Sequence, residues 1–400
     1  MNKTDTFDVI IAGGGPAGTT ASTLLAQQGH RVLLIDRDLH PRFHIGESML
    51  PMAEPVFERL GIMWDKQHYL PKNGAEFIDE AGGVSVRFPL AGEHQPYQVE
   101  RASFDLMMIN NAEKHGVIVH QQETIKEFNC SPDEVSIRTD KARYKGRYLI
   151  DATGRSAMTG RHNGSIDRIE NLGKFSLYTH YSKVDSDTAT PLFNSGDVKI
   201  ISVDIGWLWV IPLAGRRLSV GLVVQKEIAP ADRDPSLFER YMANSPLLTA
   251  VLQGAQRDFD IRAEADFSFT NSSRHGVRYA CCGDASGFLD PVFSSGVFLA
   301  IKTAEAVADR LHQALIEGNE GASDLHYQGD EEYRIGFDSM RLFVERFYHS
   351  GLVRNLFSVS DRSEELKKDI MGLLAGDLWS GNNAFQHKLL HSRQAGDLKQ

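Results

Sequence analysis

The N-terminal segment that ends at Asp36 limits the possible folds of this chain more than any other segment. Phe7–Ala12 is a short apolar run, rich in β-forming residues, that ends in Gly13–Gly15. A helical pattern over Pro16–Gln28 follows, and Arg31–Ile35 is a second apolar run that ends on Asp36. This order of strand, glycine turn, helix and strand predicts the opening βαβ unit of a dinucleotide-binding fold.

Three glycines in this segment have the spacing of a nucleotide-binding turn. Gly13, Gly15 and Gly18 form a GxGxxG pattern. Glycines at these positions permit a tight turn and let backbone N–H groups approach a pyrophosphate at the helix N-terminus. Asp36, after the next strand, can accept a hydrogen bond from a ribose hydroxyl. Because the sequence contains one such pattern, we expect one bound dinucleotide and no second unit for NAD(P)H.

Later segments of the chain add two strands and a helix to the same lobe. Arg147–Asp151 and Arg278–Cys282 are predicted strands, and a helical pattern runs over Ser295–Ala314. Alternating patterns in Glu76–Val99 and Phe175–Val224 predict a separate sheet inserted between these returns. The sequence therefore predicts an α/β fold with a Rossmann-like lobe and an inserted β-sheet lobe.

These patterns divide the chain into three expected regions. Residues 1–75, 98–174 and 275–324 form the nucleotide-binding lobe, and residues 76–97 and 175–274 form the β-sheet lobe for the substrate. We expect a polar loop at Asp185–Asp197. Residues 325–400 are mostly helical, with an aromatic-rich stripe at helical spacing made of Tyr333, Phe337, Met340, Val344 and Phe347.

The composition excludes several kinds of partner. The chain has 43 Lys and Arg against 53 Asp and Glu, a net charge of −10, which gives no general reason to bind nucleic acid. Its three cysteines, Cys130, Cys281 and Cys282, form neither a disulfide framework nor a CxxC pattern, so we expect no metal site. No run of about 18 apolar residues is present. We therefore expect a cytoplasmic protein without a membrane partner.

Three motifs identify the dinucleotide by resemblance. The predicted strand at Cys281–Cys282 ends in Gly283-Asp284, which resembles the GD motif of flavoprotein hydroxylases, whose aspartate binds the ribityl or ribose region of FAD. The DATG segment at Asp151–Gly154, and Arg101 followed by Phe104-Asp105, resemble two further motifs of those enzymes. The resemblance implies FAD as the cofactor and the aromatic-hydroxylase fold.

Three other segments resemble the flavin-dependent halogenases more closely than the hydroxylases. Gly206–Pro212 contains the complete WxWxIP signature, and on a strand Trp207 and Trp209 share one face, where two indoles would wall off the flavin edge. Arg42–Pro51 is similar to the GES-x-x-P segment of that family. Asp290–Val297 is similar to the segment that precedes its long helix, a natural anion site.

The resemblance implies roles for individual residues. Lys72, in the segment LPKNGAEF, corresponds to the essential lysine of the family. Ser295 and Gly296 would hold the halide, and the wall between flavin and substrate would consist of Trp207, Trp209, Phe293 and Val297. The expected FAD-binding residues are Gly13, Gly15, Ala17, Gly18, Asp36, Arg42, Glu47, Arg101, Gly154, Asp284 and Gly296.

The implied activity is the chlorination or bromination of an electron-rich aromatic substrate, dependent on FADH2 and O2. Hypohalous acid would form beside the flavin and act at Lys72. A separate flavin reductase would supply reduced FAD. The implied substrate is a small aromatic molecule. The segments GESMLP and DPVFSSG resemble most closely those of halogenases that act on phenols and on carrier-protein-tethered pyrroles. We favour the tethered pyrrole.

Three other functions share some of these motifs. A single-component aromatic hydroxylase would oxidise NAD(P)H by itself. A reductase of isoprenoid double bonds, such as a geranylgeranyl reductase, would work without oxygen or halide and would leave Lys72 unexplained. A flavin carrier without catalytic activity would leave the two tryptophans and the anion site at the helix start unused.

Overall fold

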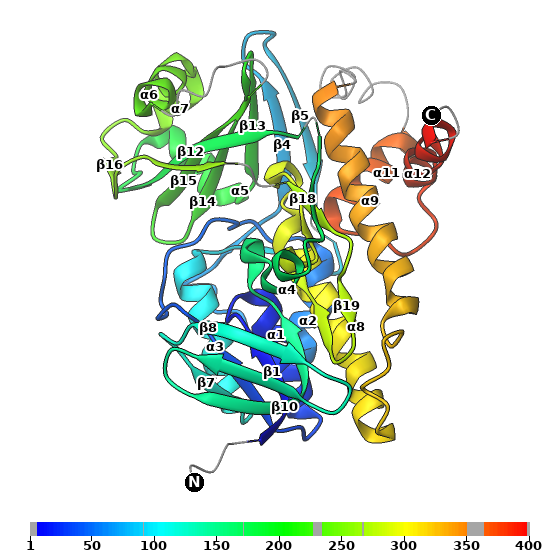
Figure 1. Ribbon diagram of the computed structural model, residues 1–400. Helices are drawn as coiled ribbons and strands as arrows, with labels where there is room; N and C mark the ends of the chain where they lie inside the picture. The colour runs from blue at the N-terminus through cyan, green and yellow to red at the C-terminus, as the bar shows by residue number, and fades with distance from the viewer. Residues whose placement is uncertain are drawn as a thin grey trace.

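The computed structural model describes residues 6–90, 92–170, 172–226, 234–265, 268–349 and 364–397. Figure 1 shows two lobes, one above the other, with the C-terminal helices along one side of both. The lower lobe contains the N-terminal strands and the upper lobe contains a second sheet. No helix among these described residues is long and apolar enough to cross a membrane.

The lower lobe is built on an eight-stranded sheet with the order β19-β20-β10-β1-β2-β7, to which β9 and β8 are joined through β10. The central strands β20, β10, β1, β2 and β7 are parallel. The carboxyl ends of parallel strands lie at one edge of a sheet, where ligands bind. The strands are β1 (Thr6–Ala12), β2 (Val32–Ile35), β7 (Ile118–His120), β8 (Ile125–Cys130), β9 (Val135–Thr139), β10 (Arg143–Asp151), β19 (His275–Gly276) and β20 (Tyr279–Cys281).

Helices cover one face of this sheet, and residues of β8 and β9 cover the other, which explains why its strands are apolar on both faces. All four residues of β2 are buried, as expected for a parallel strand between two packed layers. Helix α1 (Pro16–Gln27) packs against α3 (Arg101–Lys114) and α8 (Ser295–Glu317). The predicted strands and helices of this lobe are thereby confirmed, with ends within a few residues of those expected.

The upper lobe contains the second eight-stranded sheet, ordered β16-β12-β15-β14-β13-β4-β5 with β17 paired to β12. Most of its strands come from the two segments in which the alternating pattern predicted an inserted sheet, but β16 and β17 lie after the second of these segments. They are β4 (Gly74–Asp79), β5 (Val84–Pro89), β12 (Lys174–Ser182), β13 (Val198–Val203), β14 (Gly206–Leu213), β15 (Arg217–Gln225), β16 (Gln256–Arg257) and β17 (Arg262–Ala265). The division of the whole chain into three domains stays a prediction.

Shorter elements join and flank the two sheets. They are the strands β3 (Leu70–Pro71), β6 (Tyr97–Gln98), β11 (Ile166–Arg168), β18 (Phe269–Asn271) and β21 (Gly287–Phe288), and the helices α2 (Glu54–Arg59), α4 (Met158–His162), α6 (Pro235–Asn244) and α7 (Pro246–Val251). Strand β3 pairs with β6, and β11, β18 and β21 form a three-stranded sheet.

The expected polar loop at Asp185–Asp197 is wrong. This segment contains a 3-10 turn at Asp187–Ala189 and helix α5 (Thr190–Ser195). Leu192 and Phe193 are buried in the core of the upper lobe, together with Ala189. Their tertiary packing stabilises a helix that is too short to form on its own.

The C-terminal region is helical in its described parts: α9 (Tyr327–His349), α11 (Glu364–Ala375) and α12 (Ala384–Asp397). The aromatic-rich stripe predicted for this region lies on α9. Phe337, Met340, Val344 and Phe347 are buried in the largest core cluster, and Tyr333 packs against it. Helix α9 therefore joins this region to the main body of the protein, as Figure 1 shows.

Candidate active site

A cavity of about 930 Å³ lies where the carboxyl edge of the lower sheet meets the upper sheet. The lower lobe contributes the ends of β1, β2, β10 and β20, while the upper lobe contributes side chains of β13 and β14. Most of the predicted cofactor and wall residues line it: Gly13, Gly15, Ala17, Asp36, Arg42, Glu47, Arg101, Gly154, Trp207, Trp209, Asp284, Gly296 and Val297. Gly18, Lys72, Phe293 and Ser295 do not line it.

The glycine turn is packed so tightly that a side chain would not fit at two of its glycines. Gly13 has a φ of +105°, and a Cβ atom there would lie 2.3 Å from the carbonyl oxygen of Ala152. A Cβ atom on Gly18 would lie 1.9 Å from the carbonyl oxygen of Gly13. The turn therefore lies directly against the end of β10, and α1 lies directly against the turn. This arrangement leaves the N-terminus of α1 facing the cavity.

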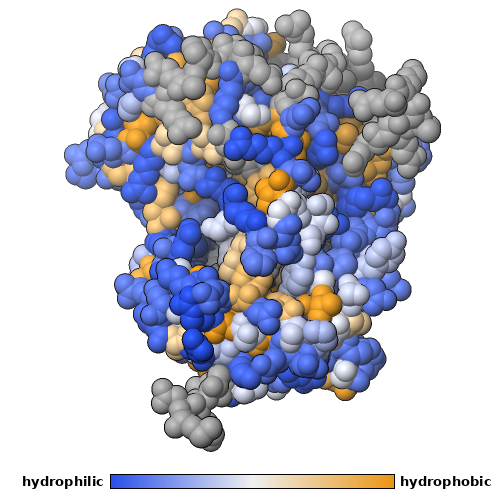
Figure 2. All heavy atoms as spheres, viewed as in Figure 1, coloured by the Kyte–Doolittle hydropathy of each residue, from blue (hydrophilic) through white to orange (hydrophobic). Residues whose placement is uncertain are grey.

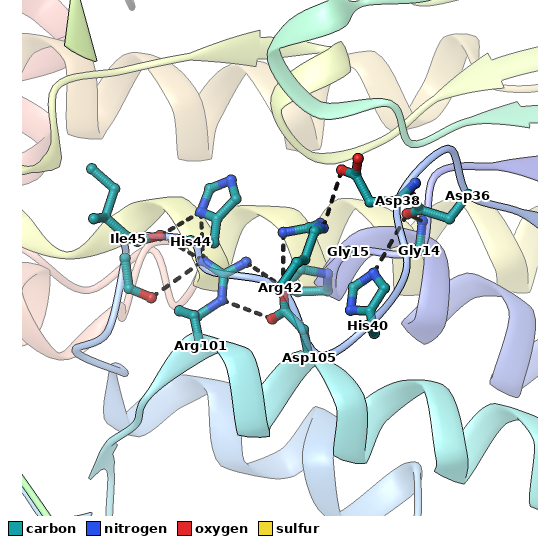
Figure 3. Close-up of polar contacts among 12 residues, drawn as sticks. Gly14, Gly15, Asp36, Asp38, His40, Arg42, His44, Ile45, Arg101 and Asp105 are labelled. Atoms are coloured by element: carbon teal, nitrogen blue, oxygen red, sulfur yellow. Dashed lines mark hydrogen bonds and ion pairs between the residues drawn. The ribbon is translucent and has the colours of Figure 1, made fainter. Parts of the chain in front are cut away.

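Asp36 is held in place as a hydrogen-bond acceptor beside the turn. Its Oδ2 atom accepts from the backbone N–H of Gly14, and its Oδ1 atom accepts from that of Asp38 at 2.7 Å. His40 Nε2 is 3.7 Å from Oδ2 (Figure 3). Burial by itself would raise the pKa of Asp36, but the contacts with His40, Asp38 and Gly14 outweigh it and lower this pKa. The carboxylate is therefore charged at neutral pH and suited to a ribose hydroxyl.

Arg42, Arg101 and His44 lie close together (Figure 3), and all three line the cavity. Arg101 donates to both carboxylate oxygens of Asp105, at 2.8 and 3.1 Å, and to the carbonyl oxygen of Ile45 at 2.8 Å. Arg42 NH1 lies 3.5 Å from Asp105. Burial, and then the charge of Arg101, lower the pKa of His44 to about 3, so its imidazole is neutral. Two fixed cations beside a helix N-terminus suit a pyrophosphate.

Asp284 follows β20 and has a carboxylate open to the cavity. Among the described residues, no group forms a hydrogen bond with its side chain. Burial raises the pKa of Asp284 to about 6, and the charges of Arg155 and Arg101 oppose this rise. An unpartnered carboxylate facing a cavity is suited to hydroxyl donors of a bound ligand. Together with the glycine turn and Asp36, it fits the ribityl and ribose hydroxyls of FAD.

Strand β14 forms the opposite wall. Trp207, Trp209 and Ile211 all line the cavity, which confirms that they share one face of the strand. The two indole rings lie 6.1 Å apart, centroid to centroid. Trp209 Nε1 donates to Ser219 Oγ at 3.0 Å, and Trp207 Nε1 donates to the hydroxyl of Tyr348 at 2.6 Å. Both indoles are therefore fixed by hydrogen bonds that point away from the cavity.

The turn before α8 reaches the cavity at Ser294, one residue before the predicted Ser295. Ser294 has a φ of +57° and lines the cavity, as do Gly296 and Val297. Ser295 is the first residue of α8, is buried, and does not line the cavity. The Phe293 ring stacks on that of Phe343, with centroids 4.0 Å apart.

Lys72 is buried just behind the cavity wall. Its side chain is 1 % exposed, and Nζ donates to the carbonyl oxygen of Met49 at 3.0 Å. Glu47 and Ser48, immediately before Met49, line the cavity. Burial lowers the pKa of Lys72 from its ordinary value to about 7, although Asp197 opposes this shift. The amine is therefore close to its titration point at neutral pH.

Three further polar residues near this site have no role predicted from the sequence. His44 and Asp290 lie within the motifs quoted above, but their positions in those motifs indicate no separate role. His180, on β12, has its Nε2 atom 2.9 Å from Glu47 Oε1, and both side chains are buried. No local pattern indicates that pair, because the two residues come from different lobes.

Comparisons with known proteins point to one family. The family model described as "Tryptophan halogenase" matches residues 8–83 and 86–355. A 1H-pyrrole-2-carbonyl-(peptidyl-carrier protein) chlorinase of Pseudomonas fluorescens is 26% identical over 94% of this chain and 90% of its own. A brominase of the same carrier-bound group, from Pseudoalteromonas luteoviolacea, is 29% identical over 94% of this chain and 93% of its own.

Solved structures share the whole fold. The flavin-dependent brominase Bmp2 superimposes with a TM-score of 0.86 at 25% identity, covering 99% of this chain and 100% of the other. A flavoprotein/dehydrogenase from Cytophaga hutchinsonii superimposes with a TM-score of 0.84 at 24% identity, covering 96% of each chain. The latter likeness shows the fold alone. Together the matches extend over both lobes and the C-terminal helices.

Proposed function

Since the chain belongs to the tryptophan halogenase family, we propose that it halogenates an aromatic ring held beside Lys72. The enzyme is a flavin-dependent halogenase that uses FAD and a halide ion. The observation that carries the proposed site is the buried amine of Lys72, separated from the cavity by the segment that includes Glu47 and Ser48. The amine is therefore near the flavin cavity but out of direct contact with it.

The residues that would hold FAD are those of the glycine turn, the Arg42–Arg101 pair, Asp36 and Asp284. When bound and reduced, FAD supplies the reduction of O2 that converts a halide ion to hypohalous acid. The chain's own contribution at this stage is to orient the cofactor and to exclude water. The wall of Trp207 and Trp209 keeps an organic substrate off the flavin, and Ser294 and Gly296 face the cavity where a halide would lie.

Lys72 would then determine where the halogen is delivered. A neutral amine reacts with hypohalous acid to form an N–halogen bond with loss of water, whereas an ammonium group holds hypohalous acid by a hydrogen bond. A lysine whose pKa burial has lowered to about 7 is available in both forms at neutral pH. In either case the electrophile stays at one atom, and the arene attacks it there with loss of a ring proton.

For the substrate we propose a pyrrole tethered to a carrier protein. The support is that two relatives, aligned over at least 90% of their own lengths, are named for a carrier-bound pyrrole-2-carbonyl group. A substrate on a flexible arm also suits a lysine that is almost fully buried, because only a narrow group can reach it. A separate flavin reductase would provide the reduced cofactor, since the sequence has one dinucleotide pattern.

The test is product analysis by mass spectrometry. The protein is incubated with FAD, a flavin reductase, NADH, and chloride or bromide, and is offered pyrrole-2-carbonyl on a carrier protein, free pyrrole-2-carboxylate, or a phenol. We expect halogenated product from the carrier-bound substrate and none without the reductase. Halogenation of the free phenol alone would contradict the proposed substrate. NADH oxidation stimulated by phenol without a reductase would favour a hydroxylase.

A further inference from the structure

A buried polar cluster, distinct from the residues assigned to FAD, lies where α9 meets the upper sheet and the turn before α8. It consists of Trp207 on β14, Tyr348 on α9, Asp290 before the turn and Lys174 on β12. Trp207, Asp290 and Lys174 are at most 2 % exposed. Burying two charged side chains is costly unless they are paired, so the cluster is unlike an ordinary apolar core.

The direction of the hydrogen bonds in this cluster follows from its chemistry. Trp207 Nε1 can only donate, so at 2.6 Å the hydroxyl oxygen of Tyr348 accepts from it. The Tyr348 hydroxyl then donates its own proton to Asp290 Oδ2 at 2.8 Å. One hydroxyl on α9 thus links the indole that lines the flavin cavity with a carboxylate behind the turn.

The other oxygen of Asp290 fixes the turn itself. Asp290 Oδ1 accepts from the backbone N–H of Val292 at 3.0 Å and caps the 3-10 turn at Pro291–Phe293. The next residue, Ser294, has the positive φ that turns the chain into α8 and brings it to the cavity wall. A non-glycine residue persists in this conformation only where its surroundings hold it.

Lys174 completes the cluster by placing a positive charge on Tyr348. Its Nζ atom lies 4.3 Å from the centre of the Tyr348 ring. Burial raises the pKa of Asp290 to about 6, whereas the Tyr348 hydroxyl, the Val292 N–H and the charge of Lys174 oppose this rise. At neutral pH the carboxylate is therefore mostly ionised, and in that form its hydrogen bond to Tyr348 is charge-assisted.

We propose that Tyr348 is a positioning residue, which holds the Trp207 indole and the turn at Asp290–Ser294 in a fixed relation on the halide side of the flavin cavity. Residues of α9 thereby contribute to halide binding without touching the halide. The inference rests on the proposed function in one respect, the placement of the halide at the turn before α8.

The test replaces Tyr348 by phenylalanine, which removes both hydrogen bonds and keeps the ring beside Lys174. Bromide binding to the oxidised holoenzyme is followed by perturbation of the FAD absorption spectrum, and indole packing by tryptophan fluorescence. We expect Tyr348→Phe to bind bromide about tenfold more weakly, to shift the tryptophan emission, and to bind FAD within about twofold of wild type, because one charge-assisted bond is lost.

Tyr333→Phe is the matched control. Tyr333 is on the same helix, and its hydroxyl donates to the carbonyl oxygen of Ser286 at 2.9 Å. We expect this variant to bind bromide as wild type does. Trp207→Phe provides a second variant, and its effect on bromide binding should not add to that of Tyr348→Phe, since both break the same link.

Two results would overturn the proposal. The first is unchanged bromide affinity and tryptophan emission in Tyr348→Phe. The second is a parallel loss of FAD and bromide from Tyr348→Phe and Trp207→Phe, which would mean that the cluster only supports the fold. None of these measurements requires turnover. A holoenzyme that makes no halogenated product would therefore count against the proposed function and not against the role of Tyr348.

Discussion

At the scale of single residues, the most unusual group is the amine of Lys72, which is enclosed by protein with one described hydrogen bond, to Met49. We expect Lys72→Ala to abolish halogenation while the oxidation of reduced flavin continues, because hypohalous acid would form without being delivered. Lys72→Arg should also be inactive if an N–halogen bond is required, since a guanidinium stays charged. Product yield by mass spectrometry, beside flavin oxidation by stopped flow, checks both.

The control for these variants is Lys199→Ala. Lys199 lies on β13, forms an ion pair with Glu76 at 2.6 Å, and does not line the cavity. It should leave the product yield unchanged. Substantial halogenated product from Lys72→Ala would show that this lysine has no catalytic role.

The pKa of Lys72 also makes a prediction about stability. Burial lowers this pKa from 10.5 in the unfolded chain to about 7 in the folded protein. Between these values the unfolded state binds more protons, so the free energy of unfolding rises with pH by up to about 1.4 kcal/mol per unit. We expect Lys72→Met to lose this rise. Urea titrations of the wild type and of Lys72→Met at pH 7.5 and 8.5 measure how much the free energy of unfolding rises with pH in each. An equal rise in the two proteins would contradict the burial of Lys72.

The two cofactor carboxylates give a further test at this scale. We expect Asp36→Ala and Asp284→Ala to weaken FAD binding by about 1.5–3 kcal/mol each, the usual contribution of a charge-assisted hydrogen bond. Asp258→Ala, which removes a carboxylate paired with Arg217, is the control. Equilibrium dialysis against FAD measures the three affinities. If both variants retained wild-type affinity, the cofactor would lie elsewhere.

At the scale of elements, the contact between the glycine turn and α1 is the tightest feature of the site. We expect Gly18→Ala to destabilise the protein by about 1–3 kcal/mol and to weaken FAD binding, because its Cβ atom would lie 1.9 Å from the carbonyl oxygen of Gly13 and push α1 away. Gly92→Ala has open space and should change neither quantity. Thermal unfolding and FAD titration check both variants, and a fully stable Gly18→Ala would refute the close packing.

The same scale shows what the sequence could and could not reveal. The β1–α1–β2 unit was predictable because its signals are local: apolar runs, glycines and one acid after the second strand. The shared face of Trp207 and Trp209 followed from the alternation of a strand. Helix α5 was missed because Leu192 and Phe193 hold it by tertiary packing. The contact of Tyr348 with Trp207 joins distant parts of the chain, so no local pattern indicates it.

At the scale of the whole molecule, the C-terminal helices are part of one continuous core with the FAD lobe. Leu373, on α11, is fully buried in that core. We expect Leu373→Ala to lower the free energy of unfolding by about 2–5 kcal/mol, as for other buried leucines. Lys368→Ala, on the exposed side of the same helix, should have little effect. Denaturant unfolding compares them, and equal stabilities would show that α11 is not part of the core.

The face shown in Figure 2 has no single dominant apolar area among the residues that the structure describes. On the face in Figure 2, hydrophobic residues are scattered among hydrophilic ones. The cavity and the buried Lys72 both lie in the interior of the protein. Most of the residues that were predicted for the cofactor site, mainly through resemblance, line this cavity. Their burial, and the pKa values that follow from it, depend on contacts between lobes that only the folded structure provides.

The strand order of the lower sheet has a consequence for the synthesis of the protein. Strand β20 lies beside β10, which lies beside β1, so the floor of the cavity combines the beginning of the chain with residues near position 280. A ribosome makes the glycine turn first and Asp284 long afterwards. The nascent chain therefore carries an incomplete nucleotide site for most of its translation. We therefore expect full affinity for FAD only after most of the polypeptide has left the ribosome, because β20 and the proposed ligand Asp284 are made late.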